Sequence, residues 1–406
     1  MSKMQSILLA RTAPMIGHLQ AYENNLSAMI PDLYEGLDVV SRELVGYIPS
    51  VSRSATTERA AVGENVKYHI APAATLFDIT PSNVIPNPAD QTLGSGSLTI
   101  TKSKGAEFGW VGEGQRALNN GIGVTSVQAD MIAQAIRTLT NAIEVDLSVT
   151  AAAAASRATG TAGTTAFASG VGDAAQLRKI LDDNGAPATG RSCVISTAVG
   201  ANLRTNLQLT KANEAGTSMT LRQGELMDLS NISFKESAQQ VSATKGTAAS
   251  ATTTNAGFAV GTTSIALASA GTGTIVAGDV IIFAGDPNKY VVVTGDTDVS
   301  NGGTIVIAAP GLRKAIPTTA TAITVGNSYD VGGVAFSSNA LVLAARAPAL
   351  PQEGDAAMDR FTLVDPRSGM PFEVSVYALY RKVRYEIACA WGTKAIKSEH
   401  IALLLS

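Results

Sequence analysis

The sequence predicts an α+β fold in which one very long helix joins several pairs of strands and an all-β segment interrupts the body. Three patterns carry this prediction. Apolar residues recur at helical spacing from about Thr125 to Ser156. Near the C-terminus, two stretches of alternating apolar residues predict an antiparallel pair. Between residues 255 and 328, short apolar clusters separated by Gly, Asp and Pro turns are typical of a small sandwich or barrel.

The composition favours a protein that is largely covered by other protein. The chain has 406 residues, of which 45% are hydrophobic and only 16% are charged. Soluble domains usually carry about 25% charged residues. Here 38 glycines and long Ala, Thr and Ser tracts replace them. The net charge of −3 gives no basic surface with which to bind nucleic acid tightly.

The ends of the chain and its cysteines indicate a protein kept in a cytoplasm-like space. The N-terminal apolar stretch is broken by Arg11 and is not followed by a cleavage pattern, so we expect no signal peptide. No window approaches the ~20 apolar residues of a membrane span. Cys193 and Cys389 are too few for a disulfide framework and are expected to be buried apolar residues.

Two N-terminal segments are expected to lie across neighbouring molecules, because neither can bury its apolar residues alone. Residues 1–51 form an amphipathic arm, and residues 52–123 form an extended loop with flanking strands. Four prolines between 72 and 88 exclude regular strand pairing at the loop tip. The candidate contact residues are Leu26, Leu33, Leu37, Val66, Tyr68, Phe108 and Trp110.

The long helix, at residues 124–156, would be a rod of roughly 45 Å. Gly121 and Gly123, just before it, are the candidate hinge. Residues 157–254 begin an α/β body. It contains a helix from Gly172 capped by Asp173, the strand SCVIS, a second helix in TAVGANLRTNLQ, and a linker over 241–257. Residues 329–406 return to that body and end in the antiparallel pair.

No arrangement of residues predicts catalysis. The three histidines, His18, His69 and His400, have no carboxylate or cysteine at ligand spacing, and no nucleotide-binding, serine hydrolase or metalloprotease motif is present. LGSGS at 93–97 reads as loop glycine. We therefore expect no enzyme activity and no cofactor.

Two acidic clusters favour polar turns. Asp182-Asp183 stand at a helix end, where solvated turn residues are expected. Asp296, Asp298 and Asn301 share one loop that superficially resembles a calcium loop. It lacks the closing glutamate, so a plain turn is favoured over a metal site.

Three stretches resemble one family in residue pattern and in order. They are LTNAIEVDLSVTAAAA in the long helix, GDVIIFAGDPNKYVVV in the all-β segment, and YEIACAWGTKAIKSEHIALLL at the C-terminus, with Trp391-Gly392 and Glu399. Together they resemble the major capsid proteins of tailed double-stranded DNA bacteriophages, which have the Hong Kong 97 fold. The closer resemblance is to the coat proteins of lambdoid short-tailed phages, in which a β-barrel insertion domain interrupts the body.

The resemblance implies a major capsid protein that assembles through pentamers and hexamers into an icosahedral shell around the phage genome. Its implied partners are further copies of itself, a scaffolding protein, a portal protein, possible decoration proteins, and double-stranded DNA packaged without sequence-specific binding. It implies assembly in the host cytoplasm and a place in the virion. The alternatives are an encapsulin-like compartment shell and, less favoured, an extracellular adhesin or surface-layer protein, which would need an export signal.

Overall fold

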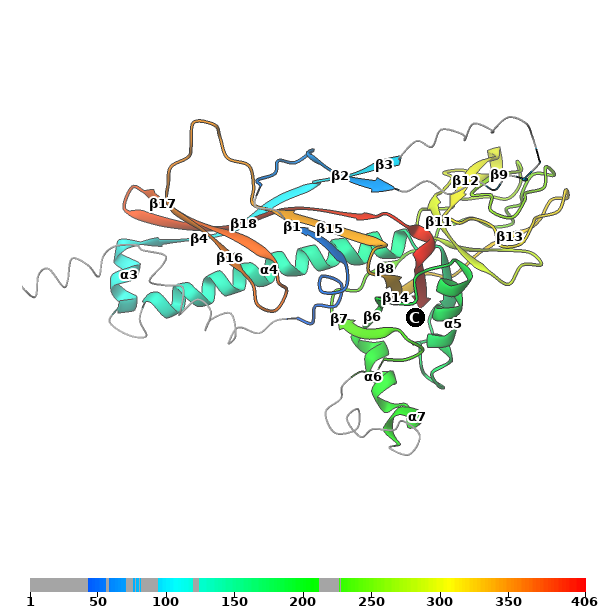
Figure 1. The fold of residues 1–406 in the computed structure, drawn as a ribbon, viewed down its shortest axis with the longest axis horizontal. Coiled ribbons are helices and arrows are strands. Elements are labelled where there is room, and N and C mark those ends of the chain that lie inside the picture. The colour runs from blue at the N-terminus through cyan, green and yellow to red at the C-terminus, as the bar shows by residue number, and fades with distance from the viewer. Residues whose placement is uncertain are drawn as a thin grey trace, which may run out of the picture.

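The computed structural model describes residues 43–55, 58–70, 76, 78–79, 81, 94–119, 124–211, 226 and 228–406. The architecture is mixed α and β, as the sequence predicted, and it consists mostly of sheet. A long helix and a six-stranded sheet run along the longest axis, and smaller β and helical parts gather near one end of the helix (Figure 1).

The six-stranded sheet is built around its longest strand, β18 (Lys382–Ala395). The first half of β18 pairs with β17 on one side, and most of its length pairs with β4 on the other. Its last residues pair with β15. The predicted antiparallel pair is thus confirmed as β17 and β18. The other bounds are β1 (Ser52–Ala55), β4 (Lys102–Val111), β15 (Leu341–Arg346), β16 (Ala357–Val364) and β17 (Pro371–Leu379).

The inner face of this sheet packs on the long helix α4 (Val124–Ala153), which ends three residues before the expected boundary at 156. The stripe predicted from the sequence is buried at Ile132, Ile136, Leu139 and Ile143, which are at most 3% exposed, and it continues to the fully buried Leu147. Alternate residues of β17 and β18 meet this stripe in the main hydrophobic core. The short helix α3 (Gly112–Asn119), which precedes α4, was not predicted.

The extended loop forms a two-stranded hairpin where the structure describes it. β2 (Asn65–Ile70) pairs antiparallel with β3 (Gly94–Thr99). The single strand expected from Gly96 to Val111 is instead split between β3 and β4, because β4 leaves the hairpin to pair with β18. Gly94 to Ser97 of the LGSGS stretch therefore belong to a strand and not to a loop. Leu98 and Ile100 attach the hairpin base to Ala344 and Ala390 of the sheet.

The second sheet has eleven strands and combines the rest of the body with the all-β segment. Helices α5 and α6 cover its centre, where a second hydrophobic cluster lies. The strands are β5 (Arg157–Gly160), β6 (Arg191–Ser196), β7 (Ser233–Ser237), β8 (Ser242–Ala243), β9 (Ser264–Leu267), β10 (Val280–Phe283), β11 (Lys289–Thr294), β12 (Gly303–Ile307), β13 (Ile323–Val325), β14 (Tyr329–Ser337) and β19 (Ile401–Leu405). The helices are α5 (Gly172–Asp183), α6 (Thr197–Thr205), α7 (Leu207–Thr210), and the single 3₁₀ turns η1 (Val299–Asn301) and η2 (Ser398–His400).

Two local predictions in the body were wrong in detail. Asp173 lies inside the first turn of α5, and its carboxylate accepts the backbone N–H of Phe167 instead of capping its own helix. The second helix is interrupted at Asn206, whose extended backbone ends α6 and whose side chain caps α7. Both differences arise because short polar side chains bind whichever backbone N–H groups the tertiary fold brings near.

The linker expected over residues 241–257 is in fact packed structure. Ala251 and Thr253 are at most 1% exposed, and bridges join Ala249, Thr252 and Thr253 to the all-β segment. Gly246 passes so close to Thr274 that a Cβ there would lie 2.2 Å from its carbonyl oxygen. The small residues of this stretch predict flexibility from the sequence. In the structure they instead allow two backbone segments to approach each other closely.

Strands β10 and β11 lie between two hydrophobic clusters and contribute side chains to both. Val280 and Val291 face the main core, whereas Ile281, Tyr290 and Val292 face a separate cluster within the all-β segment. β11 also pairs with β5 of the body. The all-β segment thus has its own core, but its strands β10 and β11 also contribute to the core of the body.

Because β10 and β11 contribute to both clusters, we expect the two clusters to unfold together. Val291→Ala and Val292→Ala remove equal volumes from adjacent, fully buried positions on opposite faces of β11. Each should lower the free energy of unfolding by on the order of 2 kcal/mol within a single shared transition. Urea unfolding of the unassembled chain, followed by far-UV circular dichroism, measures this. A separate early transition shifted only by Val292→Ala would contradict the prediction.

Candidate functional site: the subunit-contact surface

The predicted contact residues divide into three groups. Leu26, Leu33, Leu37 and the hinge residues Gly121 and Gly123 lie outside the described residues. Val66 and Tyr68 lie on β2 of the hairpin, and Phe108 and Trp110 lie on β4.

The hairpin presents a half-buried aromatic surface. Tyr68 lies over Gly96 of the partner strand, since a Cβ at Gly96 would meet its ring at 2.3 Å. The ammonium group of Lys394 lies 5.8 Å from the centroid of the same ring, within cation–π range. Val66 packs on the cluster at the hairpin base. Tyr68 is therefore oriented by its own molecule while remaining partly exposed.

Phe108 and Trp110 are directed toward α4 and pack against the main core. The Phe108 ring stacks on Tyr385 with centroids 5.1 Å apart. Trp110 lines a cleft of about 520 Å³ at the end of the sheet, together with exposed apolar residues such as Met358 and Leu379. Most of the Phe108 contact is thus internal, and Trp110 is the member of this pair that reaches an open surface.

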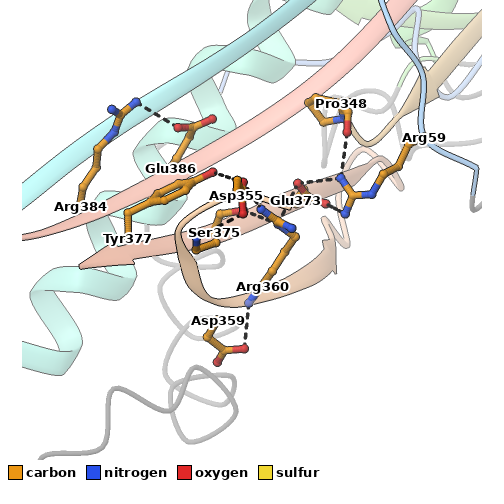
Figure 2. Close-up of polar contacts among 11 residues, drawn as sticks. Arg59, Pro348, Asp355, Asp359, Arg360, Glu373, Ser375, Tyr377, Arg384 and Glu386 are labelled. Carbon is orange, nitrogen blue, oxygen red and sulfur yellow. Dashed lines mark hydrogen bonds and ion pairs between the residues drawn. The ribbon is translucent and has the colours of Figure 1, made fainter. Parts of the chain in front are cut away.

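The outer face of the sheet carries a network of ion pairs that the sequence analysis did not identify. Arg59 binds Glu373 with both terminal nitrogens, and the Nη1–Oε1 distance is 3.1 Å. Arg360 donates to Ser375 at 3.0 Å and pairs with Asp355 and Glu373. Figure 2 shows these groups converging from β16, β17 and the preceding loops. The sequence signal was only the alternation of polar residues along β17.

The network fastens both ends of the loop 347–356 to the sheet. At one end, Arg59 donates to the carbonyl of Pro348 at 2.8 Å. At the other end, Asp355 accepts from Tyr377 at 3.1 Å and from Arg360. Burial alone would raise the pKa of Asp355, but hydrogen bonds and the Arg360 charge lower it below its usual value. The loop crown between these ends is exposed.

A prediction follows for this loop. Arg360→Leu leaves the carboxylates of Asp355 and Glu373 without that cation, so the loop should detach more often. Cleavage after Glu353 by a glutamate-specific protease should become several-fold faster. The control is Arg178→Leu, which removes an exposed pair within α5. Equal cleavage rates in wild type and Arg360→Leu would show that the network does not anchor the loop.

The acidic clusters have structural partners. Asp182 and Asp183 are not simple solvated turn residues, because they pair with the buried guanidinium groups of Arg191 and Arg157. Asp298 accepts hydrogen bonds from Ser300 and Asn301 within its own turn. Among the residues that the structure describes, no group of three or more His, Cys, Asp and Glu is placed to hold a metal ion. Within the same residues, no helix is both long and apolar enough to cross a membrane.

A second fastening holds residues 43–51, here called the strap, on α4. Two nitrogens of Arg137 donate hydrogen bonds to the carboxylate of Glu43, and Asn141 donates to the same carboxylate at 2.7 Å. Farther along α4, the fully buried carboxylate of Glu144 accepts the backbone N–H groups of Gly46, Tyr47 and Ile48 at 2.6, 2.7 and 3.1 Å. Burial raises the pKa of Glu144, and these hydrogen bonds partly oppose that shift.

The Glu43 pair predicts a specific acid response. The hydrogen bond from Arg137, followed by the one from Asn141, lowers the pKa of Glu43 from 4.5 to about 2 although burial opposes them. A lowered pKa means that the stabilisation is complete above pH 4.5 and is lost as the pH falls toward 2. Glu43→Gln should therefore flatten the decline in stability between those values.

The measurement is urea unfolding at a series of pH values. Glu353→Gln, on the exposed loop crown, is the control. An unchanged pH profile in Glu43→Gln would contradict the assignment.

No protein-family model and no curated protein matches the chain. Solved structures of similar fold include the capsid of the cyanophage P-SCSP1u, with a TM-score of 0.50 and 12% identity over 90% of this chain and 89% of that one. A Mycobacterium phage Che8 structure has a TM-score of 0.45 and 14% identity over 90% and 93% of the two chains. The capsid of Myoviridae phage XM1 has a TM-score of 0.42 and 10% identity over 91% of this chain and 95% of that one.

At these identities the likeness concerns the fold. The architecture of this chain is one found in a phage capsid shell, and it extends over nearly the whole of both chains in the cyanophage comparison. The fold expected from the sequence thus agrees with the fold of a solved phage capsid structure.

Proposed function

We propose that the chain is a major capsid protein of the Hong Kong 97 type, which assembles through pentamers and hexamers into an icosahedral shell around double-stranded DNA. The single observation that carries the proposal is the likeness to the cyanophage capsid over nine-tenths of the chain. The stiff plate of α4 and the six-stranded sheet suits a thin wall, since a helix of 30 residues is a rod of about 45 Å.

The hairpin of β2 and β3 is the part of this subunit that reaches a neighbour in our proposal. It forms a sheet of only two strands and has its own core contacts only at its base. An isolated two-stranded hairpin is marginally stable in water, so packing against another copy would stabilise it. Of the amphipathic arm 1–51, residues 43–51 pack on their own molecule as the strap, and the part before them is proposed to pack against another copy. Gly121 and Gly123 are proposed as the hinge before α4.

The all-β segment, residues 255–328, is the proposed insertion domain. It would stabilise the subunit before assembly, because removing it would take Val280 and Val291 out of the main core and would leave β5 without β11 as a partner strand. The further partners in the proposal are a scaffolding protein, a portal and possible decoration proteins. The genome would be held without sequence-specific contacts, and the shell, assembled in the host cytoplasm, would be part of the virion.

Electron microscopy of the chain purified from bacteria, alone and with its genomic neighbours, tests the proposal. Closed shells, or sheets of pentamers and hexamers, are expected in at least one of the two samples. A chain that stays monomeric or forms only small oligomers in both would overturn it.

The hairpin gives a residue-level prediction. Tyr68→Asp places a charge on the proposed contact surface, where burial without a partner would be costly. Assembled particles should be lost while the subunit keeps its wild-type circular dichroism. The control is Val260→Asp, an equally polar change at a position on the all-β segment that is 60% exposed. Normal shells from Tyr68→Asp would exclude the hairpin as a contact.

A further inference from the structure

Glu144 is unusual because it is a charged side chain in the apolar stripe of a long helix. Its neighbours along α4, Ile143 and Leu147, are fully buried core residues, and Glu144 itself is 0% exposed. None of the ion pairs seen in the described part of the chain includes it. Burying a carboxylate is costly unless it is hydrogen-bonded. Three consecutive backbone N–H groups of the strap supply most of those bonds, and the side chain of Ser237 in β7 supplies a further one.

The strap is held by side chains more than by its backbone. Among the described residues, one backbone hydrogen bond joins residues 43–51 to the rest of the molecule, from Ala238 N–H to the Leu44 carbonyl at 3.3 Å. The remaining anchors are the pairs at Glu43 and Glu144, the side chains of Tyr47, Ile48 and Val51 in the main hydrophobic core, the Tyr47 hydroxyl, which donates to Gln240, and a 3.4 Å contact from Lys235 to the Pro49 carbonyl. The sheet strands, in contrast, are joined by continuous ladders of backbone bonds.

Space for water lies on both sides of the strap. Leu44 and Val45 line a hollow of about 190 Å³ beside α4 and another of about 550 Å³ beside β7. The first hollow is also lined by Thr140, one turn before Glu144. The Thr140 side chain is 3% exposed and its hydroxyl has no hydrogen-bond partner. Water entering as the strap lifts would hydrate both Thr140 and Glu144.

We propose that Glu144 is a releasable latch: the strap leaves α4 by exchanging its three N–H donors for water, while α4 and the sheets stay folded. An apolar residue at position 144 would bury the strap permanently, whereas a carboxylate is stable both against the strap and against water. Tyr47 of the strap is the titratable group that interacts with the Glu144 charge, and Cys193 of β6 interacts in turn with Tyr47. Burial raises the pKa of both, so they stay neutral and cannot substitute for the lost N–H donors.

Hydrogen exchange of the full-length chain at neutral pH, read by mass spectrometry, tests the latch. In the wild type, amides of residues 44–51 should exchange faster than those of β18, because they open without global unfolding. Glu144→Gln places an amide N–H₂ among the strap donors. It should speed strap exchange by about 10- to 100-fold and leave β18 unchanged.

Two further variants make the result specific. Asp146→Asn, two residues along α4, weakens contacts to Lys102 and Trp391 of the sheet and should leave strap exchange unchanged. Glu144→Asp keeps the charge but withdraws it from the strap, so it should show the same selective acceleration if Glu144→Gln fails to fold. Equal exchange of strap and β18 in the wild type, or no acceleration in either Glu144 variant, would overturn the proposal. Neither result depends on whether the chain forms shells.

Discussion

The arrangement of the body depends on two carboxylates of α4, Glu144 and Asp146, which the helix directs to opposite sides. Glu144 meets the strap, and Asp146 accepts hydrogen bonds from Lys102 and from the buried indole of Trp391, at 2.6 and 2.8 Å. Because a buried carboxylate tolerates little displacement from its donors, these contacts set the position of α4 relative to both β18 and the strap.

A second constraint comes from close backbone approach. Gly46 lets the strap pass beside β6 and β7, since a Cβ there would lie 2.6 Å from Val194. Gly392 lets β18 pass under the hairpin base, where a Cβ would lie 2.2 Å from the Thr99 carbonyl. Trp391 therefore binds Asp146 of α4, and the adjacent Gly392 leaves space for the backbone that crosses it at Thr99. The high glycine content thus serves dense packing as well as turns.

Several charges of the described residues are held in buried or partly buried ion pairs. Arg157 and Arg191 are at most 4% exposed, and each binds an acidic residue at the end of α5. Arg157 also donates to Asn288, which ties the all-β segment to the body. On the outer sheet face, Arg59 and Arg360 are neutralised by their own molecule. A subunit that satisfies its charges internally presents polar but electrically balanced faces, which suits contacts among many identical copies.

The sequence by itself determined the elements whose signal is local. The stripe of α4 and the alternation of β17 and β18 were readable because helical and strand periodicities depend only on neighbouring residues. The hairpin residues Val66 and Tyr68 were found for the same reason. Only the tertiary structure decided which groups bind Glu43 and Glu144, because these partners lie about one hundred positions away along the chain. It also decided that residues 241–257 pack as structure and that Asp182 and Asp183 are paired, because small and polar residues carry no periodic signal and acquire their role from contacts distant in sequence.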